Sequence, residues 1–270
     1  MSNIPTLTDL EFDQIQHFYD NNWSLDKEKK HYVGWGYEQK RLQSTIFEFL
    51  ALYKPKLILE IGCGKGDLTF HLSNKYPNVI AIDISLVGIK RARDRTGKKN
   101  NCEFLMGDVT LLPFCCNKFD MIVFSEVLEH TLNQNQSISE IFRVLHPKGK
   151  LIITTPNSHG FYRRFLYIFS KLIKIPLRNS SQIFDNPLSV QELDSLLNPF
   201  FLTLKKRGLI FSIPYITVIK IQCLLNFVNT MSEFIENHNY LPNYGLYQCY
   251  LCSPRPSINV KPDCKLENLK

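Results

Sequence analysis

The sequence predicts an α/β protein with a doubly wound, mostly parallel sheet of seven strands. Short apolar runs that are typical of buried strands alternate with helical segments over residues 51–160. A glycine-rich loop follows the first run, and an acidic residue lies near the end of the second. Two later strand-like segments, 201–207 and 246–252, bring the expected number of strands to seven.

The first apolar run, residues 57–61, leads into a loop with three glycines at alternate positions. These glycines are Gly62, Gly64 and Gly66. Glycine permits positive φ and lets a ligand approach the backbone, so such a loop after a parallel strand can hold a nucleotide-like molecule. The spacing differs from the dinucleotide fingerprint, whose third glycine would fall at Asp67. With Glu60 inside the strand end, the pattern is instead acid-x-G-x-G-x-G.

The second and third apolar runs also lead to acidic residues. Asp83 lies 17 residues after Gly66, near the ~20-residue spacing at which an acid from the second strand reaches ribose hydroxyls. A carboxylate suits that task because it can accept hydrogen bonds from two neighbouring hydroxyls. The third run is followed by Asp108 and Val109, which we expect at the same edge of the sheet.

The fourth run, residues 119–124, leads into the string Ser-Glu-Val-Leu-Glu-His at 125–130. We expect a helix to open after this strand, in which Glu126 lies three residues from Glu129 and four from His130, so that the side chains share one face. Two carboxylates and an imidazole can bind a divalent cation. In the alternative interpretation, the histidine packs or acts as a base, and the glutamates face solvent or cap the helix.

The order of these landmarks resembles that of the class I S-adenosylmethionine (SAM) methyltransferases. The resemblance covers residues 57–157 and includes a segment at 143–157 that is similar to the family's turn into its fifth strand. It implies a Rossmann-like methyltransferase fold with an antiparallel edge, and SAM as the cofactor. The residues that it assigns to SAM are Glu60, Gly62, Gly64, Gly66, Asp83, Asp108, Val109 and Ser125.

By this resemblance, each acid has its own part of SAM. Glu60 and the glycine backbone would hold the methionine part, and Asp83 would bind the ribose. Asp108 would contact the adenine amino group, and Ser125, at the end of the fourth strand, would touch SAM through its backbone.

Two further features resemble the ubiquinone-biosynthesis O-methyltransferases (methyltransferase type 11/12). Arg41 lies in a predicted helix, 21 residues before Gly62, near the position of an arginine that contacts SAM in those enzymes; the alternative is a surface arginine. The string from Ser125 to His130 resembles their metal-binding segment, and E-x-x-E-H also occurs in small-RNA 2′-O-methyltransferases. A Mg²⁺ or other divalent cation there would lower the pKa of a substrate hydroxyl.

The segments around the strands suggest a domain organisation. Residues 1–50 form a helical leader that we expect to cover the active site, residues 51–253 the SAM-binding domain, and residues 254–270 a flexible tail. Within the domain, an insertion at 161–180 contains a basic amphipathic segment at 161–178. Such a helix can lie on an anionic membrane. It can equally be a lid that packs on the core or holds an anionic, nucleotide-linked sugar.

The composition is compatible with several classes of binding partner, so it says less about partners than the motifs do. The net charge of +7 is compatible with nucleic acid, anionic lipid or an acidic small substrate. An added RNA-binding domain or an aromatic and basic platform is not recognisable, which argues against nucleic acid. A polar start and eight cysteines without a disulfide framework favour a cytoplasmic protein with reduced thiols. Peripheral membrane contact would follow if 161–178 lies on lipid.

The leading functional hypothesis is SAM-dependent methyl transfer to an oxygen of a small or lipid-like acceptor, such as a quinol or phenol. His130 would act as the base, or together with a metal held by Glu126, Glu129 and His130. A second hypothesis is metal-free methylation of a glycan, an amine or a carbon centre. A third is a catalytically silent SAM-binding scaffold, because an intact cofactor motif does not by itself prove turnover.

Overall fold

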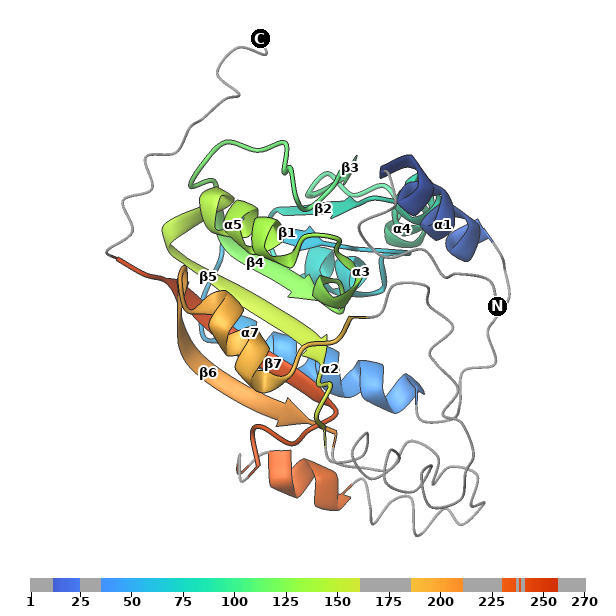
Figure 1. Ribbon diagram of the computed structural model, residues 1–270. Coiled ribbons are helices and arrows are strands. Elements are labelled where there is room, and N and C mark those ends of the chain that lie inside the picture. The colour runs from blue at the N-terminus through green and yellow to red at the C-terminus, as the bar shows by residue number, and fades with distance from the viewer. Residues whose placement is uncertain are drawn as a thin grey trace, which may run out of the picture.

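The computed structural model describes residues 12–24, 35–160, 186–210, 230–236, 238 and 241–256. Its seven-stranded sheet has the order β3-β2-β1-β4-β5-β7-β6 (Figure 1). The strands are β1 (Ile58–Ile61), β2 (Val79–Asp83), β3 (Cys102–Met106), β4 (Phe119–Ser125), β5 (Leu145–Pro156), β6 (Phe201–Leu209) and β7 (Tyr247–Pro254). The predicted fold class is confirmed.

The strand directions also agree with the expectation. Strands β1 to β5 pair in parallel, and β7 runs antiparallel to both β5 and β6. All residues of β1 and β2 are buried, as expected for parallel strands that are covered on both faces. The chain runs from β1 outward to β3 and then returns to β4 on the other side of β1. Ligands bind at such a reversal, beyond the carboxyl ends of the strands.

Helices cover both faces of the sheet. They are α1 (Phe12–Ser24), α2 (Trp35–Ala51), α3 (Asp67–Lys75), α4 (Leu86–Thr96), α5 (Gln134–Val144) and α7 (Val190–Leu197). On one face, α5 and α7 pack Ile141 and Leu193 against the sheet. On the other face, α2 and α3 contribute Ile46 and Leu72 to a second buried cluster. The two central strands, β1 and β4, therefore have a packed layer on each side, which fixes the loops at their carboxyl ends.

The predicted leader contains two helices with different neighbours. Helix α1 packs on α4, whereas α2 packs on β5 and β7. The predicted insertion at 161–180, its basic segment at 161–178 and residues 257–270 of the predicted tail lie outside the described residues. In the part of the chain that the structure describes, none of the helices has the length and hydropathy that a membrane span requires.

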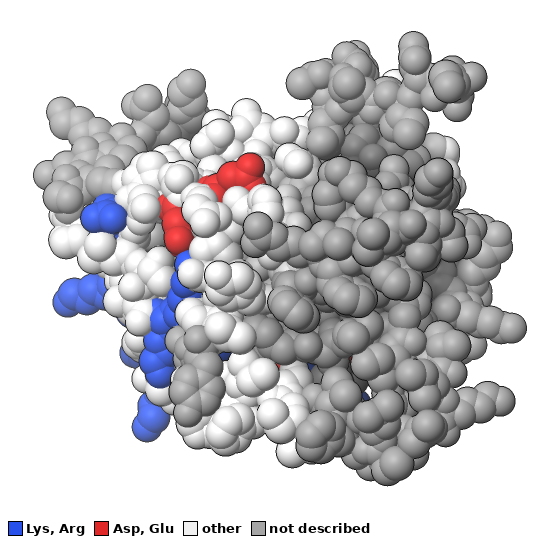
Figure 2. Space-filling model, turned by 60° about the horizontal axis from the view of Figure 1, so that its bottom comes forward, with Lys and Arg blue, Asp and Glu red and all other residues white. Residues whose placement is uncertain are grey.

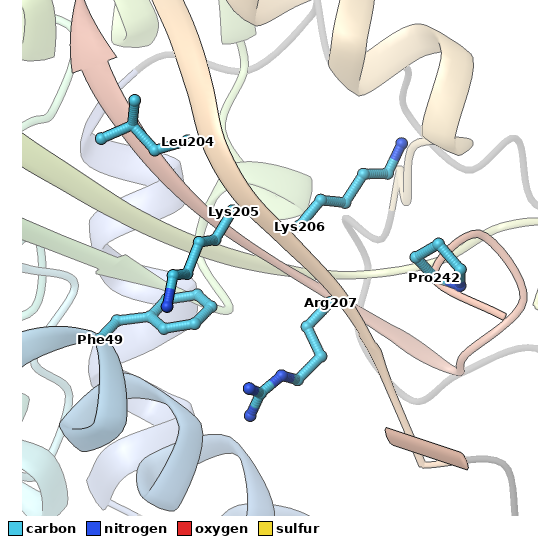
Figure 3. A pocket seen from close by; sticks show the side chains of 6 residues that line it. All are labelled: Phe49, Leu204, Lys205, Lys206, Arg207 and Pro242. Carbon is cyan, nitrogen blue, oxygen red and sulfur yellow. The ribbon is translucent and has the colours of Figure 1, made fainter. Parts of the chain in front are cut away.

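The outer edge of the sheet at β6 carries basic side chains. Lys206 pairs with Asp194 at 3.0 Å, and Arg207 pairs with Glu48. An open pocket of ≈ 330 Å³ lies at this strand (Figure 3). Its lining residues are Phe49, Leu204, Lys205, Lys206, Arg207 and Pro242. On the face seen in Figure 2, basic side chains gather in a strip along one side of the described surface. Because β4, β5 and β7 lie between β1 and β6 in the sheet, this pocket is separate from the glycine loop that follows β1.

Candidate cofactor and acceptor site

The glycine loop after β1 depends on glycine for both its conformation and its packing. Gly62, Gly64 and Gly66 have φ values of 75°, 49° and 79°, in the left-handed region that side chains disfavour. A Cβ on Gly62 would lie 2.1 Å from Cγ2 of Val127, and one on Gly66 would lie 2.7 Å from Cα of Ala92. The loop is therefore held tightly between helix α4 and the segment that follows β4.

Asp83, at the end of β2, braces this loop. Its Oδ2 accepts a hydrogen bond from the backbone N–H of Gly64 at 2.7 Å, and its Oδ1 accepts one from Ser85 at 2.9 Å. Burial raises the pKa of the Asp83 carboxyl, and the two backbone hydrogen bonds act in the opposite direction. Each carboxylate oxygen has a second lone pair, so Asp83 can hold the loop and still accept hydrogen bonds from a ribose.

Glu60 is the most perturbed acid beside the loop. Burial raises the pKa of its carboxyl from 4.5 to about 8; the nearby Thr69 lowers it, and the charges of Asp83 and Asp67 raise it further. Its Oε2 is buried and has no hydrogen-bond partner among the described residues. Such an atom is costly unless it is satisfied by a ligand. A cationic amine fits this position, as the methionine part of SAM would supply.

Asp108 and Val109 follow β3, at the same edge of the sheet. The backbone N–H of Gly107 donates to the Asp83 carbonyl at 2.9 Å, which joins the two strand ends. Both carboxylate oxygens of Asp108 accept hydrogen bonds from Thr110, one from its backbone N–H at 2.9 Å and one from its hydroxyl at 2.7 Å. Val109 is buried. The structure thus brings Glu60, the glycines, Asp83 and this turn to one edge of the sheet.

The segment after β4 differs from its prediction. A helix was expected to open at Glu126, but Leu128–His130 forms a single 3₁₀ turn, η2, and α5 begins only at Gln134. Glu126 has a φ of 57°, which is incompatible with a helix at that residue. Its backbone N–H donates to the carbonyl of Thr154 at 3.0 Å. Pairing with β5 therefore continues one residue past the strand and takes precedence over helix formation.

The two glutamates of this segment are held by neighbouring threonines of β5. The Thr154 hydroxyl donates to Oε1 of Glu126 at 2.8 Å, and the Thr155 hydroxyl donates to Oε2 of Glu129 at 3.0 Å. Successive residues of a strand point to opposite faces of the sheet, so the two carboxylates are drawn apart. The Ser125 hydroxyl lies 2.8 Å from that of Thr154, to which it donates because Thr154 gives its own proton to Glu126.

The predicted metal site does not assemble. Across the described residues, no group of three or more His, Cys, Asp or Glu side chains has an arrangement that could hold a metal ion. Glu126, Glu129 and His130 therefore do not fit as a ligand set, and we derive no reaction step through a metal. Of the three predicted ligands, Glu129 and His130 lie close together, with Oε1 of Glu129 3.7 Å from Nε2 of His130.

His130 lies where an acceptor could reach it. Its side chain is 17 % exposed, whereas the Glu129 side chain beside it is 2 % exposed. An imidazole backed by a buried carboxylate can take a proton from a hydroxyl and is then stabilised as a cation. The ring of Tyr19 meets the imidazole edge-on, with 6.4 Å between ring centroids. Tyr19 comes from α1, a contribution that the sequence analysis missed.

Arg41 lies in α2 and pairs with a buried acid. Its Nε donates to Oε2 of Glu236 at 3.0 Å. The other oxygen of Glu236 accepts hydrogen bonds from the backbone N–H of Ile210 and the hydroxyl of Ser232, both at 2.8 Å. Arg41 thus neutralises a carboxylate in the 230–236 helix, and its contact with SAM stays a prediction.

Comparisons with known proteins agree with this site. Residues 59–153 match the family model described as a methyltransferase domain. The ubiquinone/menaquinone biosynthesis C-methyltransferase UbiE of Blochmanniella pennsylvanica is 34% identical over 135 residues, which cover 46% of this chain and 53% of that protein. A probable chloroplastic tocopherol O-methyltransferase of Oryza sativa subsp. japonica is 33% identical over 106 residues, covering 38% and 29% of the two chains.

A solved structure extends the likeness of the fold. The N-methyltransferase NodS from Bradyrhizobium japonicum WM9, in complex with S-adenosyl-l-homocysteine, has a TM-score of 0.59 at 14% identity and covers 90% of this chain and 98% of its own. Our chain spans about half the length of the curated relatives it matches. The fold, the loop after β1 and the matched residues agree: residues 59–153 form a class I, SAM-dependent methyltransferase domain.

Proposed function

We propose that this protein transfers a methyl group from SAM to an oxygen of a small or lipid-like acceptor, such as a quinol or phenol. The observation that carries the cofactor part is the buried, unpartnered oxygen of Glu60 beside a glycine loop that Asp83 braces. A deeply buried carboxyl oxygen with no hydrogen-bond partner costs stability, which a cationic ligand would recover.

The site has two halves: a cofactor half, with Glu60, the glycine loop, Asp83 and Asp108, and an acceptor half, with Glu129 and His130. SAM, when bound, supplies an electrophilic methyl group. Glu60 would accept a hydrogen bond from its amine, Asp83 would hold its ribose hydroxyls, and Asp108 would contact its adenine. His130 would take the proton from the acceptor hydroxyl while Glu129 stabilises the imidazolium. Much of the acceleration would come from holding the two reactants in line.

The acceptor class draws support from the relatives and from His130. The names of two relatives point to quinones and tocopherol, which supports a lipid-like ring. The same relatives and NodS are named for carbon, oxygen and nitrogen methylation, so likeness alone does not choose the atom. Oxygen is favoured by the pairing of His130 with the buried Glu129, because a hydroxyl must lose its proton as the new bond forms.

The experiment that tests this function separates catalysis from binding. The protein is incubated with SAM and a panel of reduced quinols, simple phenols, amines and glycans, and products one CH₂ heavier are sought by mass spectrometry. A methyl ether of a quinol or phenol is the expected product. Methylation only at carbon or nitrogen would overturn the oxygen assignment. Binding of SAM in a calorimeter without product from any acceptor or cell extract would favour a silent scaffold.

A lipid-like acceptor would also require access from a membrane surface. The sequence of residues 161–178, which segregates basic and apolar residues on a helical wheel, supports peripheral binding to anionic lipid. Co-sedimentation with anionic vesicles at low salt should fall when four basic residues of the segment are replaced by glutamine. Those residues are Arg163, Arg164, Lys171 and Lys174. The matched control replaces four exposed lysines elsewhere, Lys90, Lys98, Lys148 and Lys205, and equal loss in both would defeat the proposal.

A further inference from the structure

One face of helix α1 spans both halves of the site. Gln16, Tyr19, Asp20 and Trp23 follow the i, i+3, i+4, i+7 spacing, which places them in one row along the helix. Gln16 contacts Met106 of β3, Tyr19 contacts the turn after β4, and Asp20 and Trp23 contact α4, Trp23 also the glycine loop. We call this row the inner face of α1.

Trp23, at one end of the inner face, covers the glycine loop. Atoms Cζ2 and Cη2 of its indole lie 2.9 and 3.2 Å from the position that a Cβ on Gly64 would take, and Cδ1 lies 3.3 Å from that of Gly88. The indole therefore lies against two glycines and uses the space that their missing side chains leave. It lies on the side of Gly64 that the missing Cβ leaves open, from which a ligand could approach the backbone.

Asp20 fixes α1 at the start of α4. Its Oδ1 accepts hydrogen bonds from the hydroxyl of Ser85 at 2.5 Å and from the backbone N–H of Val87 at 3.0 Å. Ser85 is the N-cap of α4 and also donates its own N–H to Asp83. An acid at a helix N-terminus interacts favourably with the exposed N–H groups there. Ser85 thus has two roles: it binds Asp20 of α1, and it donates to Asp83, which braces the glycine loop.

Tyr19 is the residue of the inner face that contacts the acceptor half of the site. Its ring lies edge-on to His130, at an interplanar angle of 61°, and Nε2 of the same imidazole lies 3.7 Å from Oε1 of Glu129. Aromatic pairs in this geometry are attractive and orient each other. Since Tyr19 and Trp23 are four residues apart on one rigid helix, a shift of α1 at the glycine loop would also move the ring that packs on His130.

We propose that α1 couples the two halves of the site: Trp23 contacts the bound cofactor, and Tyr19 positions His130 in response. This inference rests on the proposed binding of SAM. A ligand that approaches Gly64 from the side of the missing Cβ must displace the indole or stack on it, and in either case the surroundings of Trp23 differ from those in the free protein. The coupling is reciprocal, so a variant that releases Tyr19 from His130 also changes how tightly the cofactor is held.

The test uses S-adenosylhomocysteine as the probe, because it needs no acceptor. The chain has two tryptophans, so Trp35→Phe leaves Trp23 as the single fluorophore, and ¹³C-labelled histidine gives a side-chain NMR signal that His130→Gln assigns. Calorimetry measures binding independently. In the Trp35→Phe background, we expect Trp23 fluorescence and the His130 signal to change with one midpoint, equal to the calorimetric Kd.

Four variants in the same background separate coupling from folding, which circular dichroism monitors. Trp23→Ala should weaken binding about tenfold, the scale of a lost aromatic contact, and should leave the His130 signal unresponsive at saturation. In Tyr19→Ala the His130 signal should also be unresponsive to the probe. Tyr19→Phe keeps the ring and should therefore keep the response of the His130 signal. The matched control, Asn21→Ala, removes an exposed side chain from the same helix and should change nothing.

The outcomes distinguish this inference from the proposed function. If S-adenosylhomocysteine binds but leaves Trp23 fluorescence unchanged, or if the His130 response survives in Tyr19→Ala, the coupling is refuted while cofactor binding stands. If the calorimetric affinity and the His130 response both persist unchanged in Trp23→Ala, Trp23 is refuted as the cofactor contact. If the probe does not bind to the folded protein at all, cofactor binding fails and the inference fails with it.

Discussion

The glycine loop after β1 and the turn after β4 lie at the carboxyl ends of neighbouring parallel strands, where Ile61 pairs with Phe124. Both contain left-handed backbone, but for different reasons. In the loop, glycines take the positive φ values at little steric cost. In the turn, Glu126 takes a φ of 57°, which for a residue with a side chain costs about 1–3 kcal/mol.

The two regions are stabilised in different ways. The loop is determined by residue type and by hydrogen bonds to the end of β2, where the Ile82 carbonyl accepts from Gly62 and Cys63 and Asp83 accepts from Gly64. The strained turn is held by hydrogen bonds from β5, where Thr154 engages both the backbone and the carboxylate of Glu126. Strain that is held by the surroundings is frequent at functional sites. We therefore expect substitutions in the loop region to affect cofactor affinity, and substitutions in the turn to affect turnover.

The largest effect should come from His130→Ala. Loss of the base should lower turnover about 10²–10⁴-fold, the usual range for an acid–base group. The Kd for SAM should change far less, and by no more than in Tyr19→Ala, because on the cofactor side His130→Ala loses only the contact with Tyr19. His17→Ala, an exposed histidine on α1, is the matched control. A folded His130→Ala enzyme with full activity would make this histidine structural and would remove the division between the two halves.

The next effect is a pH dependence set by Glu60. Its folded pKa of about 8 is raised from 4.5 by burial, so the unliganded protein keeps the proton until the pH approaches that value. Because a cationic amine favours the carboxylate, SAM affinity should rise with pH, by up to about tenfold per unit below the folded pKa, and then level off. Calorimetry in buffers of different ionisation enthalpy should detect one proton released on binding.

The glutamine variant tests this assignment. Glu60→Gln cannot release a proton, so its SAM affinity should be weaker and flat across the same pH range. The sign for stability is opposite to that for binding: the raised pKa means that the unliganded fold loses stability as the pH rises from 4.5 through about 8. Glu60→Gln should remove that loss. Equal pH profiles for the two proteins would show that another group is responsible.

Asp83→Ala should have a smaller effect, confined to the cofactor half. It removes an acceptor for the ribose and the brace on Gly64, so SAM binding should weaken by about 1–3 kcal/mol, the cost of an unsatisfied hydrogen-bonding group. Asp94→Ala, which removes an exposed carboxylate from α4, should have wild-type affinity in the same calorimetric measurement. Wild-type affinity in Asp83→Ala would refute the ribose assignment.

The two regions also differ in how far the sequence predicted them. The loop and the strands follow from local rules, namely buried apolar runs and glycine spacing, and these predictions of the fold are confirmed. The turn depends on partners 28 and 26 residues away on β5, which spacing within the string cannot reveal. The same holds for Arg41, whose partner Glu236 lies 195 residues along the chain, and for Tyr19 and Trp23, which meet the site only after α1 docks.

The smallest effect on turnover should follow from adding a chelator or from removing the charge of Glu126. Because the threonines of β5 hold Glu126 and Glu129 apart, we expect EDTA to leave turnover unchanged, and Glu126→Gln, which keeps an acceptor for Thr154, to be mild. Thr154→Val tests the same contact from β5 and should lower stability by about 1 kcal/mol, as for one lost hydrogen bond. Reversible inhibition by EDTA, together with large losses in Glu126→Gln and Glu129→Gln, would mean that the turn rearranges around a metal on binding its acceptor. The acceptor half would then be assembled by its ligands, whereas the glycine loop is already formed without them.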